Sequence, residues 1–127
     1  MKQFPEISFR KIPDKSGDSA TFLSFFLPDA SRARTVAQKL SQNGVDGSFY
    51  WFDNYWHYLR NWEHVKKLKS LSRLPLMLLE QYPDYDTIKL PASDEIMSRT
   101  ISMLIKLSWT EEEIQQRIEK IEDVLKG

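Results

Sequence analysis

The stretch EISFRKIPDKSGDSATFLSFFL, residues 6–27, decides the fold class of this chain. Residues 6–12 alternate apolar and polar side chains, which is typical of a half-buried strand. Residues 20–27 are almost continuously apolar, as expected of a central strand. Between them, residues 13–18 have the composition of a tight turn. Because adjacent strands joined by a tight turn cannot be parallel, the sequence predicts an antiparallel pair.

A helix and a third strand are predicted after this pair. Asp29 or Ser31 can cap the helix, because a side-chain oxygen at that position accepts a hydrogen bond from an unpaired N–H group. Apolar residues recur at helical spacing through residues 33–40. Asn43-Gly44 is a typical helix stop, and residues 48–52 read as a short aromatic strand.

The middle of the chain is predicted to consist of helix and loop. Residues 56–71 have a mixed helical pattern and are predicted to form one helix. Residues 74–79 are apolar, and residues 81–87 form a polar loop that contains tyrosines. A short helix begins at residues 93–95, after Pro91.

A last strand and a last helix complete the pattern. Residues 100–107 alternate as a strand, and Thr110 with Glu113 forms a capping box at the start of the final helix. Isoleucines and a leucine then mark one face of that helix. The order of elements predicts an α+β fold, with a small, mainly antiparallel sheet covered by helices on one face.

Length and composition exclude several classes of protein. A chain of 127 residues fits a single domain over residues 1–127. Eighteen basic and eighteen acidic residues give a net charge of zero, which argues against a nucleic-acid partner. The chain has no cysteine, so disulfides and thiolate metal sites are excluded. It shows no membrane-spanning run and no signal peptide, so we expect no membrane contact and a cytoplasmic location.

The aromatic residues are concentrated in one segment. Eight of the sixteen lie within residues 49–62, and His57 and His64 lie in or just after it. Four interpretations remain open: a buried core or interface, a nucleic-acid stacking platform, a metal site, and a small-molecule pocket. The two histidines are about 10 Å apart along a straight helix, so they cannot share a metal there, and we expect no metal site. In the pocket interpretation, His57 and Arg60 project together at i, i+3.

Three segments, taken in order, carry a resemblance to a known family. They are YWHYLR at residues 55–60, LPASDEIMSRTISMLI at residues 90–105 and WTEEE at residues 109–113. With them, residues 45–127 resemble the C-terminal part of the DegT/DnrJ/EryC1/StrS family of pyridoxal-phosphate-dependent sugar aminotransferases. Residues 1–44 fit the same domain more loosely, as its first hairpin and helix.

The segment around His57 departs from the usual family form, which has prolines beside the histidine. Residues 53–64 are most similar to the branch that aminates a 3-deoxy-octulosonate (Kdo-type) keto sugar. The resemblance thus implies a transferase of sugar biosynthesis, of the kind that forms an 8-amino-3,8-dideoxy-octulosonate. It also implies the fold of the small domain of fold-type-I aminotransferases.

The resemblance implies that the cofactor chemistry and the substrate contacts belong to two different domains. In this family a large N-terminal domain carries the cofactor lysine and the phosphate cradle, and this chain lacks that domain. We therefore expect no catalytic and no cofactor-binding residue here, no pyridoxal phosphate bound by this chain alone, and no activity of the isolated chain. The expected partners are the large domain, a keto-sugar substrate and a second subunit in a homodimer. His57 would hydrogen-bond the sugar or the cofactor side of the cleft, and Arg60 would pair with a carboxylate.

A second function from another class remains open: a stand-alone, non-catalytic interaction or regulatory module with the same fold. Members of the sugar aminotransferase family are generally dimers whose pockets form between domains and subunits, so the resemblance implies that a small domain alone exposes its former interface. Eight aromatic side chains in fourteen residues are more than a small sheet can easily bury. We therefore expect part of residues 51–62 to be solvent-exposed, poorly ordered or buried in a self-association contact.

Overall fold

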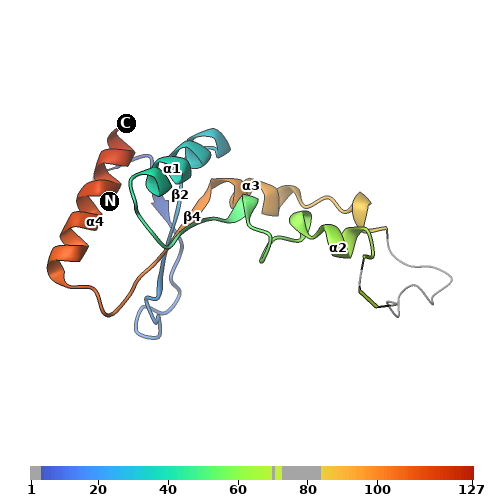
Figure 1. Ribbon diagram of the computed structural model, residues 1–127, viewed down its shortest axis with the longest axis horizontal. Coiled ribbons are helices and arrows are strands. Elements are labelled where there is room, and N and C mark those ends of the chain that lie inside the picture. The colour runs from blue at the N-terminus through green and yellow to red at the C-terminus, as the bar shows by residue number, and fades with distance from the viewer. Residues whose placement is uncertain (1–3, 70, 73–83) are drawn as a thin grey trace.

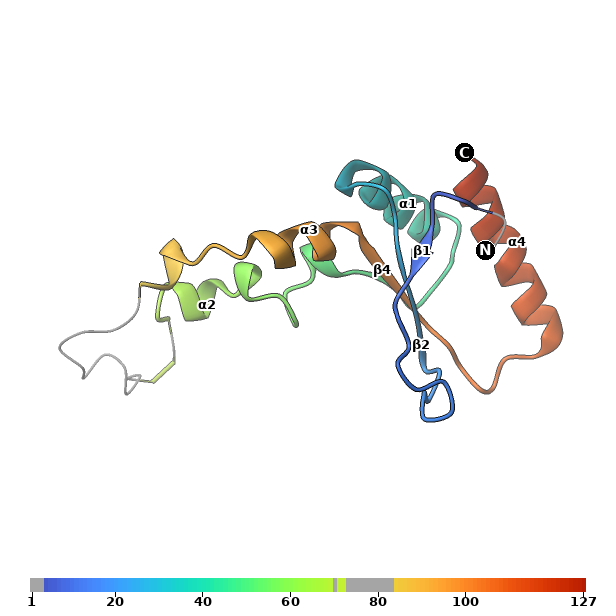
Figure 2. The same cartoon turned by 180° about the vertical axis from the view of Figure 1, so that it is seen from behind.

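The structure, a computed structural model, describes residues 4–69, 71–72 and 84–127. It consists of a body, formed by the sheet with helices α1 (Ala30–Gln42) and α4 (Glu111–Lys126), and an arm that projects to one side of it (Figure 1). The arm contains helices α2 (Glu63–Lys66) and α3 (Pro91–Arg99) and the segments that lead to them. Seen from behind, the arm lies beyond the end of the sheet, and neither α2 nor α3 covers the face that α4 covers (Figure 2).

The sheet has four antiparallel strands in the order β1-β2-β4-β3. The predicted first pair of strands is confirmed, because β1 pairs antiparallel with β2. The central pair joins two segments that lie far apart in the sequence, with Phe25 opposite Ile101. The strands are β1 Ser8–Phe9, β2 Phe22–Phe26, β3 Ser48–Tyr50 and β4 Thr100–Leu104.

Four α-helices are present in the described residues, together with short 3-10 turns. Helices α1 and α4 pack against each other and share a core with the sheet, whereas α2 and α3 belong to the arm. The helices are α1 Ala30–Gln42, α2 Glu63–Lys66, α3 Pro91–Arg99 and α4 Glu111–Lys126. The 3-10 turns are Trp51–Asp53, Leu59–Asn61 and Tyr85–Thr87.

The core lies between one face of the sheet and the two helices of the body. Phe25 and Ile101, which are partners in the sheet, are completely buried, as are Val36 and Leu40 of α1. The C-terminal half of α4 contributes Ile121, Val124 and Leu125. The fold is therefore α+β, with a small antiparallel sheet covered by helices on one face, as the sequence predicts.

The two helix starts that were predicted from capping residues are confirmed, whereas α3 begins at Pro91, before the predicted residues 93–95. Of the two candidates for the first cap, Asp29 is the residue used: its carboxylate accepts a hydrogen bond from the backbone N–H of Arg32 at 2.8 Å. The capping box of α4 is complete, since the Thr110 hydroxyl accepts from the Glu113 N–H and the Glu113 carboxylate accepts from the Thr110 N–H. These caps satisfy N–H groups that the helices leave unpaired.

The predicted helix over residues 56–71 is wrong. This segment contains the 3-10 turn Leu59–Asn61 and the single turn α2, and Leu68 has a positive φ of 50° that ends the helical path. Its polar groups bind distant partners instead: the Asn61 side chain donates to the carbonyl of Phe52 at 2.7 Å. Aromatic residues are weak helix formers, so these tertiary contacts prevail.

The predicted strands are longer than the observed ones. The alternating pattern of residues 100–107 continues past the end of β4, where Ile105 and Leu107 are exposed. Ile114 and Ile118 of α4, predicted on an apolar face, remain about two-fifths exposed. Predictions for residues 74–79, and for the first part of the loop at 81–87, lie outside the described residues.

Within the described residues, no helix combines the length and the apolar character that a membrane crossing requires.

Candidate functional site

Two serine hydroxyls lie on the sheet face opposite the helices. Ser24 of β2 and Ser102 of β4 are partners in the sheet, and their Oγ atoms are 2.6 Å apart. The indole Nε1–H of Trp51 donates to the Ser102 Oγ at 2.6 Å. Since Ser102 is buried, this hydrogen bond fixes the indole ring to the sheet at the point where the arm begins.

Five rings form a continuous strip from this face towards the arm, which we call the aromatic strip. Ring centroids are 6.3 Å apart for Phe22 and Phe49 and 6.1 Å apart for Phe49 and Trp51. His57 stacks on Trp51 with centroids 4.9 Å apart, and Trp56 meets His57 edge-on at 6.5 Å. These separations are typical of favourable aromatic pairs.

The outer end of the aromatic strip is open to solvent. Trp56 is 74% exposed and the adjacent Tyr55 is 71% exposed. Trp51 and Trp62 are only partly buried. The prediction that part of residues 51–62 is exposed in the lone chain is therefore confirmed, and the aromatic segment is not simply core.

His57 is exposed and is oriented by stacking alone. In the described part of the chain no hydrogen bond reaches either of its ring nitrogens, whereas its ring faces the fixed indole of Trp51. A neutral imidazole has one donor and one acceptor nitrogen. His57 can therefore donate to and accept from a polar ligand that approaches the aromatic strip.

Arg60 is held by a carboxylate of α3. Its Nε donates to Asp94 Oδ1 at 2.8 Å, and its Nη2 contacts Asp94 Oδ2. The hydroxyl of Tyr58 also donates to Asp94 Oδ1. Tyr58 is only 4% exposed, so Asp94 connects a buried phenol and a surface guanidinium to the same helix.

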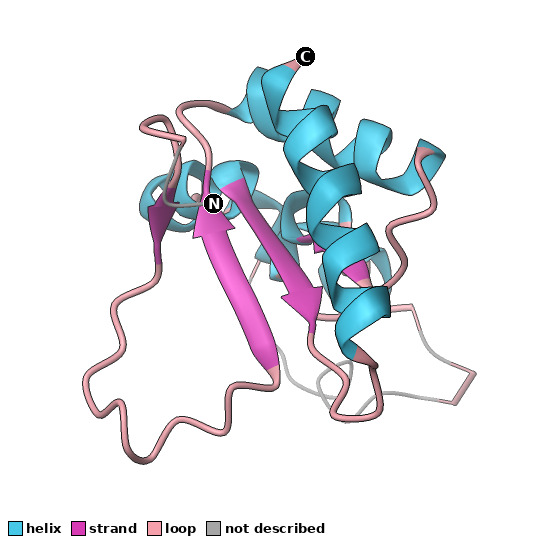
Figure 3. Ribbon diagram, turned by 90° about the vertical axis from the view of Figure 1, so that its left-hand side faces the viewer, coloured by secondary structure: helices cyan, strands magenta, loops and turns pink. Residues whose placement is uncertain are grey.

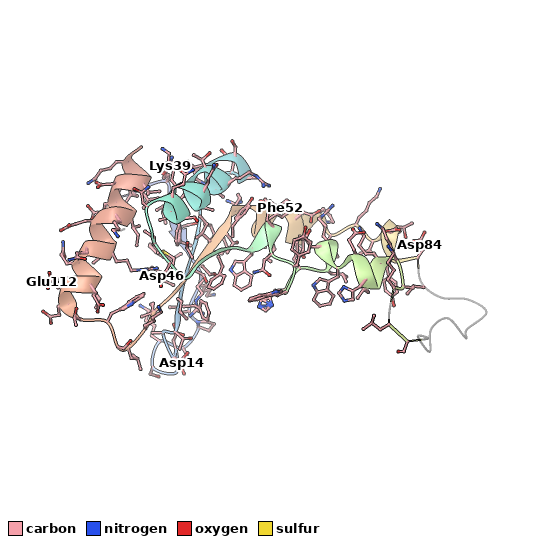
Figure 4. All side chains as sticks on the ribbon, viewed as in Figure 1. Asp14, Lys39, Asp46, Phe52, Asp84 and Glu112 are labelled. Atoms are coloured by element: carbon pink, nitrogen blue, oxygen red, sulfur yellow. The ribbon has the colours of Figure 1, made fainter. Side chains whose placement is uncertain are left out.

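The structure gives His57 and Arg60 separate environments. The shared helix face expected from the i, i+3 spacing does not form, because residues 59–61 are a 3-10 turn. His57 contacts Trp51, and Arg60 contacts Asp94. In Figure 4, Phe52 marks the root of the arm that carries both residues, and Asp84 marks its far end.

Tyr50 connects the root of the arm to α1 and α3. Its hydroxyl donates to the carbonyl of Ser98 at 2.9 Å, and the Arg34 guanidinium lies 5.4 Å from its ring centre. Arg34 also pairs with Asp53 at 2.6 Å. Burial raises the pKa of Tyr50, with the Arg34 charge acting in the opposite direction. The phenol therefore stays protonated and keeps its hydrogen bond at neutral pH.

Sequence reasoning missed two residues of this region, Ser102 and Asp94. Ser102 occupies a polar position in an alternating strand, and such positions usually face solvent. Asp94 lies in the first turn of α3, where an acidic residue is explained by the helix dipole. Its partners are 34 and 36 residues away, and no local pattern indicates them.

Of the lysines at a cleft of the body, Lys106 does not fit pyridoxal phosphate, the cofactor that the resemblance implies for the complete enzyme. Lys106 and Lys120 border a cleft of the body. Lys106 forms an ion pair with Asp46 at 3.0 Å, and its Nζ lies 5.8 Å from the Trp109 ring centre. The amine of Lys106 is therefore already engaged and is not free to bind a cofactor. Nor do the described residues contain a cluster of three or more potential metal ligands.

A comparison with models of known protein families finds no match for this chain.

Proposed function

We propose that this chain is the small, C-terminal domain of a pyridoxal-phosphate-dependent aminotransferase that aminates a keto sugar. The chemistry would belong to a large domain outside these 127 residues, and this domain would supply contacts to the substrate and to the other domain. The three sequence segments that resemble the sugar aminotransferases and the α+β architecture support this proposal. The complete enzyme would be a cytoplasmic homodimer.

The observation that carries the proposal is the exposed end of the aromatic strip beside His57. Exposed aromatic rings that adjoin one another, as Tyr55 and Trp56 do, are typical of a surface that binds a partner. Trp56 is 74% exposed, although its neighbour His57 stacks on a fixed indole. A docked large domain would cover Trp56 and enclose His57 at the edge of the cleft between the domains.

Within that cleft, His57 would hydrogen-bond the sugar, because its ring nitrogens have no partner in the described structure. Arg60 would bind the carboxylate of a sugar acid. Asp94 accepts hydrogen bonds from the Nε and Nη2 atoms of the Arg60 guanidinium, so the N–H donors of Nη1 remain free. A guanidinium that is already fixed loses little side-chain entropy when it binds a second anion. This arrangement suits a carboxylate-bearing sugar of the octulosonate type.

The test compares two proteins. The 127-residue chain, supplied with pyridoxal phosphate, glutamate and a keto-sugar acid, should show no amino-group transfer. A polypeptide that joins it to the large domain encoded in frame upstream should show transfer that depends on the keto sugar. Turnover by the chain alone would contradict the assignment of the chemistry to the large domain.

The exposed aromatic strip also suits the second candidate, a non-catalytic interaction module that binds a protein partner through Tyr55 and Trp56. The DNA upstream of the chain separates the two. An in-frame large domain with a cofactor lysine favours the aminotransferase, and a stop codon directly before Met1 favours the module.

A further inference from the structure

The outer edge of β3, the last strand of the sheet, has backbone groups that can pair with a further strand. At the start of the β3–β4 pair, the N–H of Leu104 donates to the carbonyl of Gly47. Hydrogen-bonded and non-bonded positions alternate in an antiparallel pair, so Ser48 and Tyr50 direct their backbone groups away from β4. In the described part of the chain, no hydrogen bond reaches the N–H groups of Ser48 and Tyr50 or the carbonyl of Ser48.

A groove of about 380 Å³ lies between this edge and α1. On the α1 side it is lined by Ala37 and Ser41, one helical turn apart, whose small side chains leave the edge accessible. Figure 3 shows α4 alongside the two central strands, whereas the helix that packs against β3 is α1. Peptides that add to a sheet use this combination, because the edge supplies main-chain hydrogen bonds and the groove takes alternate side chains.

A second cleft, with a positive net charge, adjoins the groove before β3 begins. Gly44, Val45 and Asp46 line both, and Figure 4 labels Asp46. The charged side chains of this cleft are three cations and two carboxylates, a net charge of +1: Lys106, Arg117, Lys120, Asp46 and Glu113. Asp46 already binds Lys106 and Arg117, and Glu113 belongs to the capping box. The Nζ of Lys120 lies near Gly44 and forms no ion pair with another described residue.

From these features we propose that the edge of β3 binds an extended peptide segment of another protein as a fifth strand, with a carboxylate of that peptide beside Lys120. All pairs of this sheet are antiparallel, and the added strand continues that pattern. Because β3 runs away from Gly44, an antiparallel peptide ends near Lys120. The carboxylate is therefore the carboxyl terminus or an acidic side chain near it. This site belongs to the body and does not depend on the aminotransferase assignment.

Backbone pairing has a signature that no other binding mode shares. Selection from a library of random hexapeptides with free carboxyl termini should yield peptides that bind the 127-residue chain with a micromolar Kd in fluorescence polarisation. N-methylation of single residues of a selected peptide should weaken binding by about tenfold or more at every second position only, because alternate N–H groups of a strand face one side. Failure to select any peptide would overturn the proposal, as would equal losses at all positions.

Substitutions in α1 locate the peptide. Ser41→Trp places an indole in the groove from an exposed position and should abolish binding. Thr35→Trp, also exposed on α1 but not part of the groove lining, is the matched control and should keep the Kd within about twofold. Circular dichroism shows that both variants are folded. A selected peptide that binds Ser41→Trp as tightly as the unmodified chain would contradict the site.

The carboxylate is tested from both sides. Lys120→Met should weaken binding by about threefold or more, whereas Lys126→Met, on the same helix and paired with Glu122, should not. If the carboxyl terminus is the anion, amidation of the peptide should abolish the effect of Lys120→Met. If an acidic side chain is the anion, its replacement by the corresponding amide should do so instead. A peptide whose affinity is indifferent to Lys120→Met and to both changes would overturn the assignment of Lys120.

Discussion

One carboxylate, Asp94, receives hydrogen bonds from two side chains of the arm, Tyr58 and Arg60. The two contributions differ in strength. Arg60 is about half exposed, so its ion pair is weakened by water. The Tyr58 hydroxyl is buried and would be left without a partner if Asp94 were removed. The stability of this region therefore depends on the phenol more than on the guanidinium.

Asp94→Ala should lower the free energy of unfolding by about 1–3 kcal/mol, because it leaves the buried Tyr58 hydroxyl unpaired. Urea denaturation measures the loss. Glu95→Ala, one position along the same helix and 72% exposed at its side chain, is the matched control and should change stability by less than about 0.5 kcal/mol. Equal effects of the two substitutions would show that the Tyr58–Asp94 hydrogen bond contributes nothing.

At the scale of elements, Asp46 joins the segment before β3 to α4 and to the segment that precedes α4. Its carboxylate binds Lys106 at 3.0 Å and Arg117 at 2.6 Å. Arg117 and Lys106 also lie over the ring of Trp109. These hydrogen bonds, with that of Lys106 first, hold the pKa of Asp46 below its ordinary value of 3.8. The ionised form is therefore favoured in the folded state.

A depressed pKa makes the contribution of Asp46 depend on pH. The stabilisation is present above the ordinary pKa of 3.8 and is lost as pH falls through the lower pKa of the folded state. Asp46→Asn should therefore lower the urea midpoint at about pH 7, and the gap from the unmodified chain should narrow below about pH 3.8. Asp123→Asn, an exposed acid on α4, is the control. A gap that widens as pH falls would contradict this sign.

Elements with local signals were predictable from the sequence. The turn composition of residues 13–18, the Asp29 cap and the Thr110–Glu113 capping box each act within a few residues, and each predicted the correct element. The segment 56–71 was not predictable, because its conformation depends on partners from distant segments, such as Asp94. The candidate site was predictable only in part, for the same reason. The exposure of its aromatic residues could be predicted from composition. The separation of His57 from Arg60 could not, because it depends on their contacts with Trp51 and Asp94.

At the scale of the whole molecule, the exposed end of the aromatic strip can be measured in solution. Trp56 should account for most of the tryptophan fluorescence that iodide or acrylamide quenches, because it is the most exposed of Trp51, Trp56 and Trp62. Trp56→Phe should remove most of that quenchable fraction. Trp51→Phe should remove much less, since that indole is stacked and hydrogen-bonded. If the two variants behaved alike, Trp56 would not be open in the lone chain.

The most direct test of the proposed function is the kcat/KM for the keto sugar of the polypeptide that joins these 127 residues to the cofactor-binding domain, with and without His57→Ala. If this domain supplies the sugar contact, the variant should lose about a hundredfold in kcat/KM, as expected when a positioning contact to a substrate is removed. Trp62→Phe, also in the aromatic segment, should keep its activity. An unchanged kcat/KM for His57→Ala would contradict the account.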